Sequence, residues 1–236
     1  MSAGEGSAPR DERGMGLPLP AHWPGDAAVQ RRVRLVMLLD AAEQAGLLPL
    51  SLVRLHAFAY LSNVLAPVWR LAPLDGKLLK RRGGPFYPDL QRDLDRLVGT
   101  GVVAIAELRY VADADDRWRV DGSCRLNPAS AAPILEAVAR YDDERRLLAF
   151  IQELAYALSA LGDAELDRLF TEDATYTDPL VSVDNVIDFA EWRDSNHTAD
   201  VANYFDRLLP GGIQPTMGEK LHLYARHLHR RFAGAS

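Results

Sequence analysis

The sequence has a single cysteine, Cys124, among its 236 residues. One cysteine excludes an internal disulfide bond and a zinc site built from several cysteines, and it suits the reducing environment of the cytoplasm. Because Cys124 lies within an alternating apolar pattern, it is more typical of a small core residue than of a nucleophile. We therefore expect a cytoplasmic protein whose fold depends on packing.

The sequence also lacks long apolar runs and an excess of basic residues. No run of about 18 apolar residues is present, so a transmembrane helix is not expected. Residues 1–26 are rich in Gly, Ala and Pro, lack the apolar stretch of a signal peptide, and are expected to form a flexible arm. Because the net charge is -6, any contact with DNA has to come from a local basic patch.

A recognisable catalytic set is missing as well. The Gly-x-Ser-x-Gly pattern of a serine hydrolase does not occur. Asp178, Asp184, Asp188 and His197 could hold a divalent metal or act as acid and base, which leaves a metal-dependent enzyme as one alternative. A solvated acidic face is the commoner explanation for such a cluster. We expect a non-enzymatic protein with no cofactor and no bound metal.

Two helices are predicted near the start of the ordered chain. Apolar residues at helical spacing indicate helices over residues 29–45 and 51–66. Gly46 is a plausible end for the first helix, and Pro67 ends the second. The second helix is apolar on most of its sides, which predicts a central, buried position.

The stretch KRRGGPFYPDLQRDLDRLVGTGVV, residues 80–103, predicts a turn followed by a third helix. The turn is expected at residues 83–85, and a short strand near residues 77–80 precedes it. Pro88 suits the first helical position, and Gly99 suits a left-handed C-cap. Leu90, Leu94 and Leu97 share one face of this helix.

A change of period follows the third helix. Residues 102–111 and 118–126 alternate between apolar and polar side chains, which predicts a half-buried β-hairpin. Three helices followed by a hairpin are typical of a winged helix-turn-helix, expected here over residues 27–127. Residues 128–236 are expected to form a helical C-terminal region. The predicted fold class is mainly α with a small β-hairpin, an α+β protein.

Four segments of the C-terminal region show helical patterns. We expect helices over residues 142–161, 183–192 and 198–209, and a last helix that runs to residue 232. Thr216 and Glu219 have the spacing of a capping box for this last helix.

A cluster of basic residues surrounds the third helix and forms the candidate surface for binding DNA or a partner. Asp93 and Asp95 lie on the same helix, and the tip of the hairpin, DADD at residues 113–116, is acidic. Carboxylates repel phosphates, so this composition favours a protein-facing surface over direct reading of DNA. The candidate residues are Lys80, Arg81, Arg82, Tyr87, Arg92 and Arg96.

Two segments carry a resemblance to a known family. LHAFAYLSNVLAPVW at residues 55–69 and GGPFYPDLQRDLDRLVGTGVV at residues 83–103 resemble the middle components of bacterial three-component ABC-ATPase systems. These are small proteins encoded beside an SMC-like or Rad50-like ATPase and associated with antiphage or mobile-element defence. More distantly, the layout is similar to the winged-helix subunits that bind the kleisin of bacterial condensins.

The resemblance covers mainly residues 29–126, which is less than half of the chain, and brings no catalytic residue. It implies a non-enzymatic accessory subunit of an ATPase complex acting on DNA, with a winged helix for protein docking and room for weak DNA contact. The alternative is a winged-helix transcription regulator in which Tyr87, Arg92 and Arg96 contact DNA, while the basic residues 80–82 hold phosphates.

Overall fold

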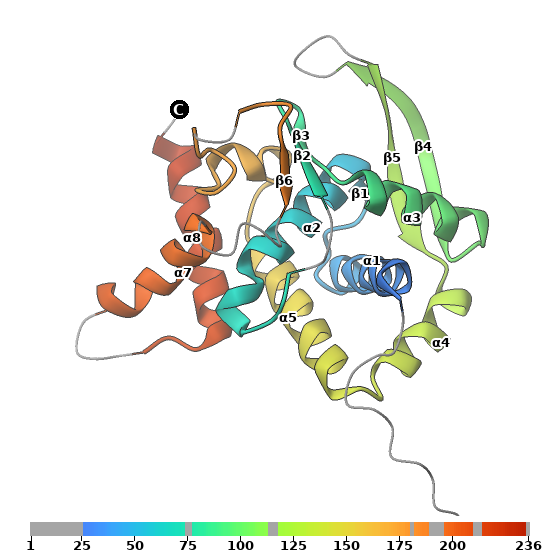
Figure 1. The fold of residues 1–236 in the computed structure, drawn as a ribbon, viewed down its shortest axis with the longest axis horizontal. Coiled ribbons are helices and arrows are strands. Elements are labelled where there is room, and N and C mark those ends of the chain that lie inside the picture. Colours follow the sequence, from blue (N-terminus) through green and yellow to red (C-terminus); the bar gives the residue numbers. More distant parts are fainter. Residues whose placement is uncertain are drawn as a thin grey trace, which may run out of the picture.

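The computed structural model describes residues 26–73, 77–112, 118–179, 182–188, 196–209 and 214–234. Over these residues the chain is an α+β protein, mostly helical with two small antiparallel sheets (Figure 1). No helix among these residues has both the length and the apolar character needed to cross a bilayer. The expected arm, apart from residue 26, and the acidic hairpin tip lie outside the described residues.

The first two helices confirm the prediction from apolar spacing. Helix α1, Ala27–Gln44, begins at an Asp26 cap, and Gly46 follows it with a left-handed φ of 73°. The short strand β1, Leu50–Ser51, leads into α2, Leu52–Leu65. Of the 14 residues of α2, 12 are buried, so this helix is the centre of the core. A 3-10 turn, Ala66–Trp69, follows α2.

The third predicted helix is α3, Pro88–Gly99, with Pro88 at its first position. Strands β2, Lys77–Arg81, and β3, Gly84–Phe86, form a tight hairpin before it. Residues 84–85 therefore belong to a strand, and the turn is confined to residues 82–83. Gly101, rather than Gly99, takes the left-handed conformation after α3, because the helix continues through Gly99 to a cap at Thr100.

The predicted hairpin consists of β4, Val103–Ala112, and β5, Trp118–Leu126, which form a sheet of order β1-β5-β4. At its base the expected burial is found, since Cys124 and Val103 are buried. The outer half extends beyond the helices (Figure 1), so the expectation of a half-buried strand is wrong there. Trp118 is 72% exposed and Val120 49% exposed.

The C-terminal region forms helices that pack around α1 and α2. Helix α5 packs against α1 and α8, and α7 packs against α8. Thr216 and Glu219 form the predicted capping box, because each side chain accepts the other residue's backbone N–H. The elements are α4, Pro128–Val138; α5, Asp142–Leu158; α6, Asp163–Leu166; the 3-10 turn η2, Leu169–Glu172; α7, His197–Leu208; and α8, Met217–Gly234.

One element of this region is a strand where a helix was predicted. Residues 183–192 were expected to be helical, but Val186–Asp188 form β6, and residues 189–192 lie outside the described part. β6 pairs with β2 in a second sheet of order β3-β2-β6. The pairing joins elements from both sides of the expected boundary at residue 127, so the two regions share a sheet.

A buried carboxylate holds the same two regions together. Asp173 is fully buried and accepts hydrogen bonds from the hydroxyls of Tyr60 on α2, Tyr224 on α8 and Thr198 on α7. Its Oδ1 also accepts the backbone N–H groups of Thr175 and Tyr176. Because a buried polar group without partners is costly, these donors and their acceptor have to be assembled together.

Replacing Asp173 by Asn should lower the free energy of unfolding by about 3 kcal/mol. The amide NH2 of Asn is itself a donor, so at least one of the three hydroxyls loses its acceptor. Urea unfolding followed by circular dichroism measures this loss. Asp200→Asn is the matched control, since Asp200 is exposed on α7, and it should change stability by less than about 0.5 kcal/mol. Equal losses in the two variants would contradict the central role of Asp173.

Candidate functional site

Two residues of the predicted binding surface, Lys80 and Tyr87, are buried, so the prediction is wrong for them. Lys80 is 7% exposed, and its ammonium donates to the backbone oxygen of Asp178 at 3.0 Å. Tyr87 is 2% exposed, and its hydroxyl accepts from Asn63 at 2.9 Å. The loop that holds Tyr176 and Asp178 covers Lys80, and Tyr87 is bonded to Asn63 and His56 of α2. Neither side chain can reach DNA or a partner in this fold.

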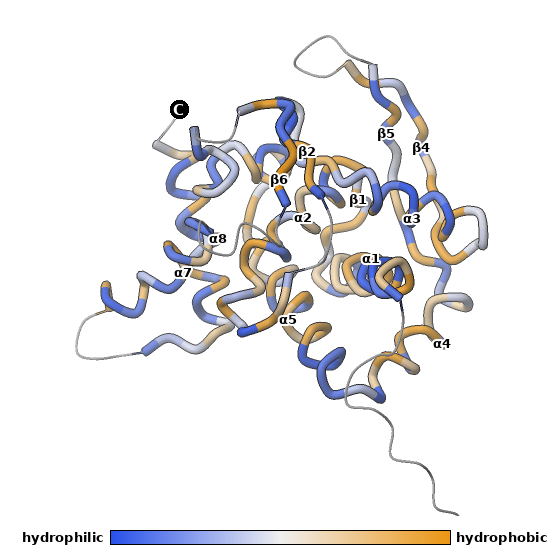
Figure 2. The backbone as a smooth tube through the Cα atoms, in the orientation of Figure 1, coloured by the Kyte–Doolittle hydropathy of each residue, from blue (hydrophilic) through white to orange (hydrophobic). Residues whose placement is uncertain are grey.

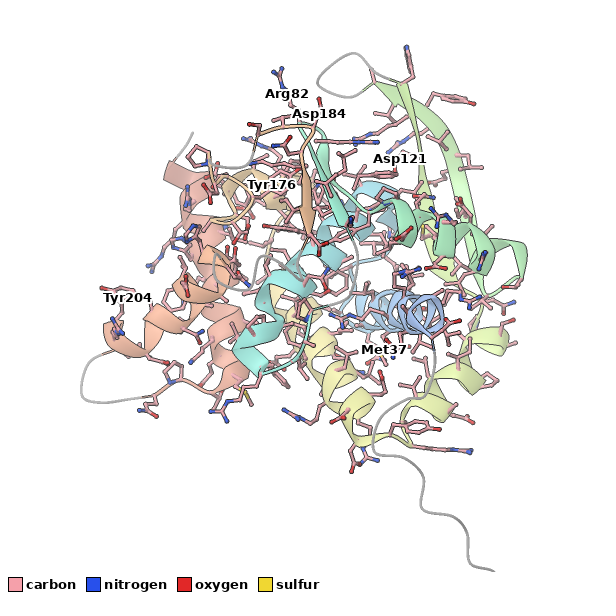
Figure 3. All side chains as sticks on the ribbon, in the orientation of Figure 1. Met37, Arg82, Asp121, Tyr176, Asp184 and Tyr204 are labelled. Carbon is pink, nitrogen blue, oxygen red and sulfur yellow. The ribbon has the colours of Figure 1, made fainter. Side chains whose placement is uncertain are left out.

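Three of the predicted residues lie on the surface. Arg92 and Arg96 are exposed on the outer face of α3, and Arg82 extends from the turn between β2 and β3 (Figure 3). Arg92 forms an ion pair with Asp89 at 3.0 Å. Asp93 is buried and pairs with Arg31 of α1 at 2.7 Å, so it does not neutralise the outer face of α3.

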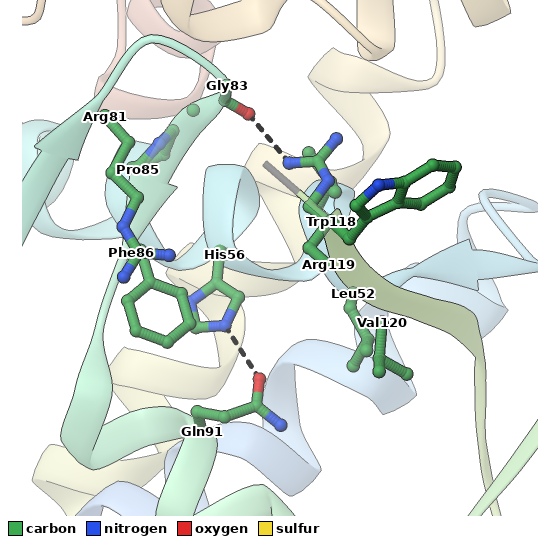
Figure 4. A pocket seen from close by; sticks show the side chains of 12 residues that line it. Leu52, His56, Arg81, Gly83, Pro85, Phe86, Gln91, Trp118, Arg119 and Val120 are labelled. Carbon is green, nitrogen blue, oxygen red and sulfur yellow. Dashed lines mark hydrogen bonds between the residues drawn. The ribbon is translucent and has the colours of Figure 1, made fainter. Parts of the chain in front are cut away.

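A cavity of about 230 Å³ lies between the β2–β3 hairpin, the start of α2 and residues 118–120 of β5 (Figure 4). Of the predicted surface residues, Arg81 lines it, together with polar residues that the sequence did not indicate. None of the described residues that line it carries a carboxylate. The lining residues with polar or aromatic side chains are His56, Arg81, Phe86, Gln91, Trp118 and Arg119.

His56 lines the cavity as a neutral base. Its Nδ1 accepts the backbone N–H of Tyr87 at 3.2 Å, so the proton is assigned to Nε2, which donates to Oε1 of Gln91 at 3.2 Å. Burial, and to a smaller extent the charges of Arg81 and Arg119, lowers the pKa of His56 to about 4. The positive charge of both arginines therefore reaches this part of the cavity.

The two arginines are held by different contacts on opposite sides of His56 (Figure 4). The Arg81 guanidinium lies 4.1 Å from the centre of the Phe86 ring. Arg119 donates from Nη1 to the backbone oxygen of Gly83 at 3.1 Å. The Nε of Arg119 is buried and has no hydrogen-bond partner among the described residues.

The outer half of the hairpin presents an exposed apolar face. Tyr110 lies opposite Val120, and Ala112 lies opposite Trp118 in the register of β4 and β5. Leu108 is 64% exposed and Tyr110 is 75% exposed. Figure 2 shows the alternation of hydrophobic and hydrophilic residues along these strands. We call Leu108, Tyr110, Trp118 and Val120 the wing patch.

The acidic residues weighed as a metal site are brought together only in part. His197 Nε2 lies 3.4 Å from Oδ2 of Asp178. Asp188 lies opposite Lys77 in the pairing of β6 with β2. Asp184 precedes β6 and has a left-handed φ of 67°. Across the described ranges, no group of three or more His, Cys, Asp or Glu side chains is placed to hold a metal ion.

The sequence did not reveal the cavity or the wing patch. Arg119 stands on the polar side of the alternating pattern, which gives no sign that it points toward Gly83 of another hairpin. The apolar residues of β4 and β5 were a signal for burial, but none of the helices in the described part of the chain covers their outer half.

We also compared the chain with known proteins: no family model matches it, and neither the curated proteins nor the solved structures gave a match.

His56 should make stability depend on pH. Its pKa is about 4 in the folded protein and about 6.5 in the unfolded chain, so the unfolded state binds the proton first as pH falls. The stabilisation is present above about pH 6.5 and is lost as pH falls toward 4, by about 2 to 3 kcal/mol. Urea unfolding at pH 7 and pH 4.5 measures this change.

His56→Gln is the control for the carboxylates that titrate over the same range. The variant lacks the imidazole, so the difference between its unfolding free energies at the two pH values should be smaller than that of the wild type by about 2 kcal/mol. An identical pH dependence in the two proteins would rule out a neutral, buried His56.

Proposed function

We propose that the chain is a cytoplasmic, non-enzymatic accessory subunit of an SMC-like or Rad50-like ATPase complex that acts on DNA, in antiphage or mobile-element defence. In this proposal a winged-helix unit docks onto the ATPase and leaves room for weak DNA contact. The resemblance of residues 55–69 and 83–103 to such middle components supports the choice of partner.

The order of elements supports the winged-helix part of the proposal. Helix α1, strand β1, helices α2 and α3, and the β4–β5 hairpin follow one another, and β1 pairs with β5. This is the order of a winged helix, with the β2–β3 hairpin inserted between the second and third helices. The third helix, α3, presents Arg92 and Arg96 outward.

The wing patch is the observation that carries the docking function. A wing that follows the DNA backbone requires basic side chains for phosphates. This one exposes Arg109, which pairs with Asp121 at 3.3 Å, beside two aromatic and two aliphatic residues. Contiguous exposed apolar side chains mark interaction sites, and Tyr and Trp often dominate their binding energy. The matching surface of the ATPase should therefore be apolar at the place where these side chains dock.

Tyr110→Ser should weaken binding to the ATPase by about thirtyfold, since truncating a central aromatic residue costs about 2 kcal/mol or more. Co-purification from the native host, after nuclease treatment, followed by titration of the purified ATPase, measures the loss. Tyr204→Ser is the matched control, because Tyr204 is 51% exposed on α7, far from the hairpin (Figure 3). Unchanged binding of the Tyr110 variant would contradict docking through the wing patch.

The exposed arginines of α3 keep the transcription regulator as the second candidate. In that case Arg92→Ala and Arg96→Ala should weaken DNA binding by about 1–3 kcal/mol for each lost base contact. Loss of all protein partners on nuclease treatment, together with recovery of DNA before it, would favour the regulator over the docking subunit.

A further inference from the structure

The cavity beside His56 has the chemistry of an anion site. It is bounded by two guanidinium groups, and none of its described lining residues is acidic, although the chain as a whole carries a net charge of -6. The charge of the cavity is therefore opposite in sign to the net charge of the chain. Arginine forks match the oxygens of phosphate and carboxylate groups.

The free hydrogen-bonding capacity in the cavity points in the same direction. Arg119 uses Nη1 for the backbone oxygen of Gly83, while its buried Nε lacks a partner among the described residues. That Nε has almost no accessible surface, so a group in the cavity would reach the outer N–H groups of the guanidinium. Arg81 is held by the Phe86 ring, a contact that leaves its N–H groups available at the edge of the guanidinium.

The floor of the cavity is polar but uncharged. His56 is neutral because its Nδ1 accepts a backbone N–H, and Gln91 donates from Nε2 to Asp95 at 2.9 Å. The volume of about 230 Å³ is below the usual range for drug-sized ligands, about 300–1,000 Å³. The cavity therefore suits a small charged group and the atoms attached to it.

From these observations we propose that the cavity binds a phosphate monoester between Arg81 and Arg119. The monoester can belong to a free nucleotide or to the 5′ end of a DNA strand, which share this group. The proposal goes beyond the docking function. Trp118 and Val120 of the wing patch also line the cavity, but Arg81 and Arg119, which would hold the phosphate, are outside the patch.

Isothermal titration calorimetry tests the proposal with adenosine monophosphate, inorganic phosphate and a DNA 12-mer with or without a 5′-phosphate. Wild-type protein should bind adenosine monophosphate or the phosphorylated 12-mer, and Arg119→Met and Arg81→Met should each weaken binding about tenfold or more. Arg125→Met is the control, because Arg125 is exposed on the same strand as Arg119 but does not line the cavity.

The probes distinguish the two sources of the phosphate. Binding of adenosine monophosphate without preference for the phosphorylated 12-mer assigns the site to a nucleotide, and a strict need for the 5′-phosphate on the 12-mer assigns it to a DNA end. Arg119→Lys, which keeps the charge, should bind more tightly than Arg119→Met, which separates a lost contact from a misfolded hairpin. Tyr110→Ser should bind the probes normally, so failure of docking and failure of this site are separate results.

Three outcomes would overturn the proposal. One is the absence of heat with every phosphate probe, and another is equal binding by the wild type and the two methionine variants. The third is equally tight binding of acetate, which would show a general anion site rather than one for a phosphate monoester.

Discussion

The carboxylate of Asp173 connects the helices that define the molecule. It lies where α2, α7 and α8 meet, and a hydroxyl from each helix donates to it. Hydroxyls and a carboxylate lose their hydrogen bonds to water on burial. These groups regain hydrogen-bond partners only when the three helices meet at Asp173. The same contact places the C-terminal helices against α2, whose other end forms one wall of the cavity with His56.

Local sequence patterns predicted the parts of the fold that local forces determine. Pro88 and the leucines of α3 predicted that helix, and the alternation in residues 118–126 predicted β5. β6 was missed because a three-residue strand has too little periodicity, and only its pairing with β2 distinguishes it from the helix expected there. Long-range pairing overrides local preference in such short segments.

The same limit explains the mixed outcome for the candidate site. Arg82, Arg92 and Arg96 are exposed because they lie on a turn and on the outer face of α3. Lys80 looked equivalent to its basic neighbours, but its side chain points toward the loop that precedes β6 and contacts the backbone of Asp178. Arg119 joined the site through a contact with Gly83, 36 residues away, and sequence spacing contains no information about such a contact.

The pairing of β2 with β6 also has a consequence for biosynthesis. β2 leaves the ribosome about a hundred residues before its partner strand, a delay of roughly 5–20 s at usual rates of translation. During that interval one edge of β2 lacks its partner, and the Lys80 ammonium remains in water, since the Asp178 backbone oxygen has not yet been made. The nascent chain therefore has an unpaired edge of β2 until β6 has been synthesised.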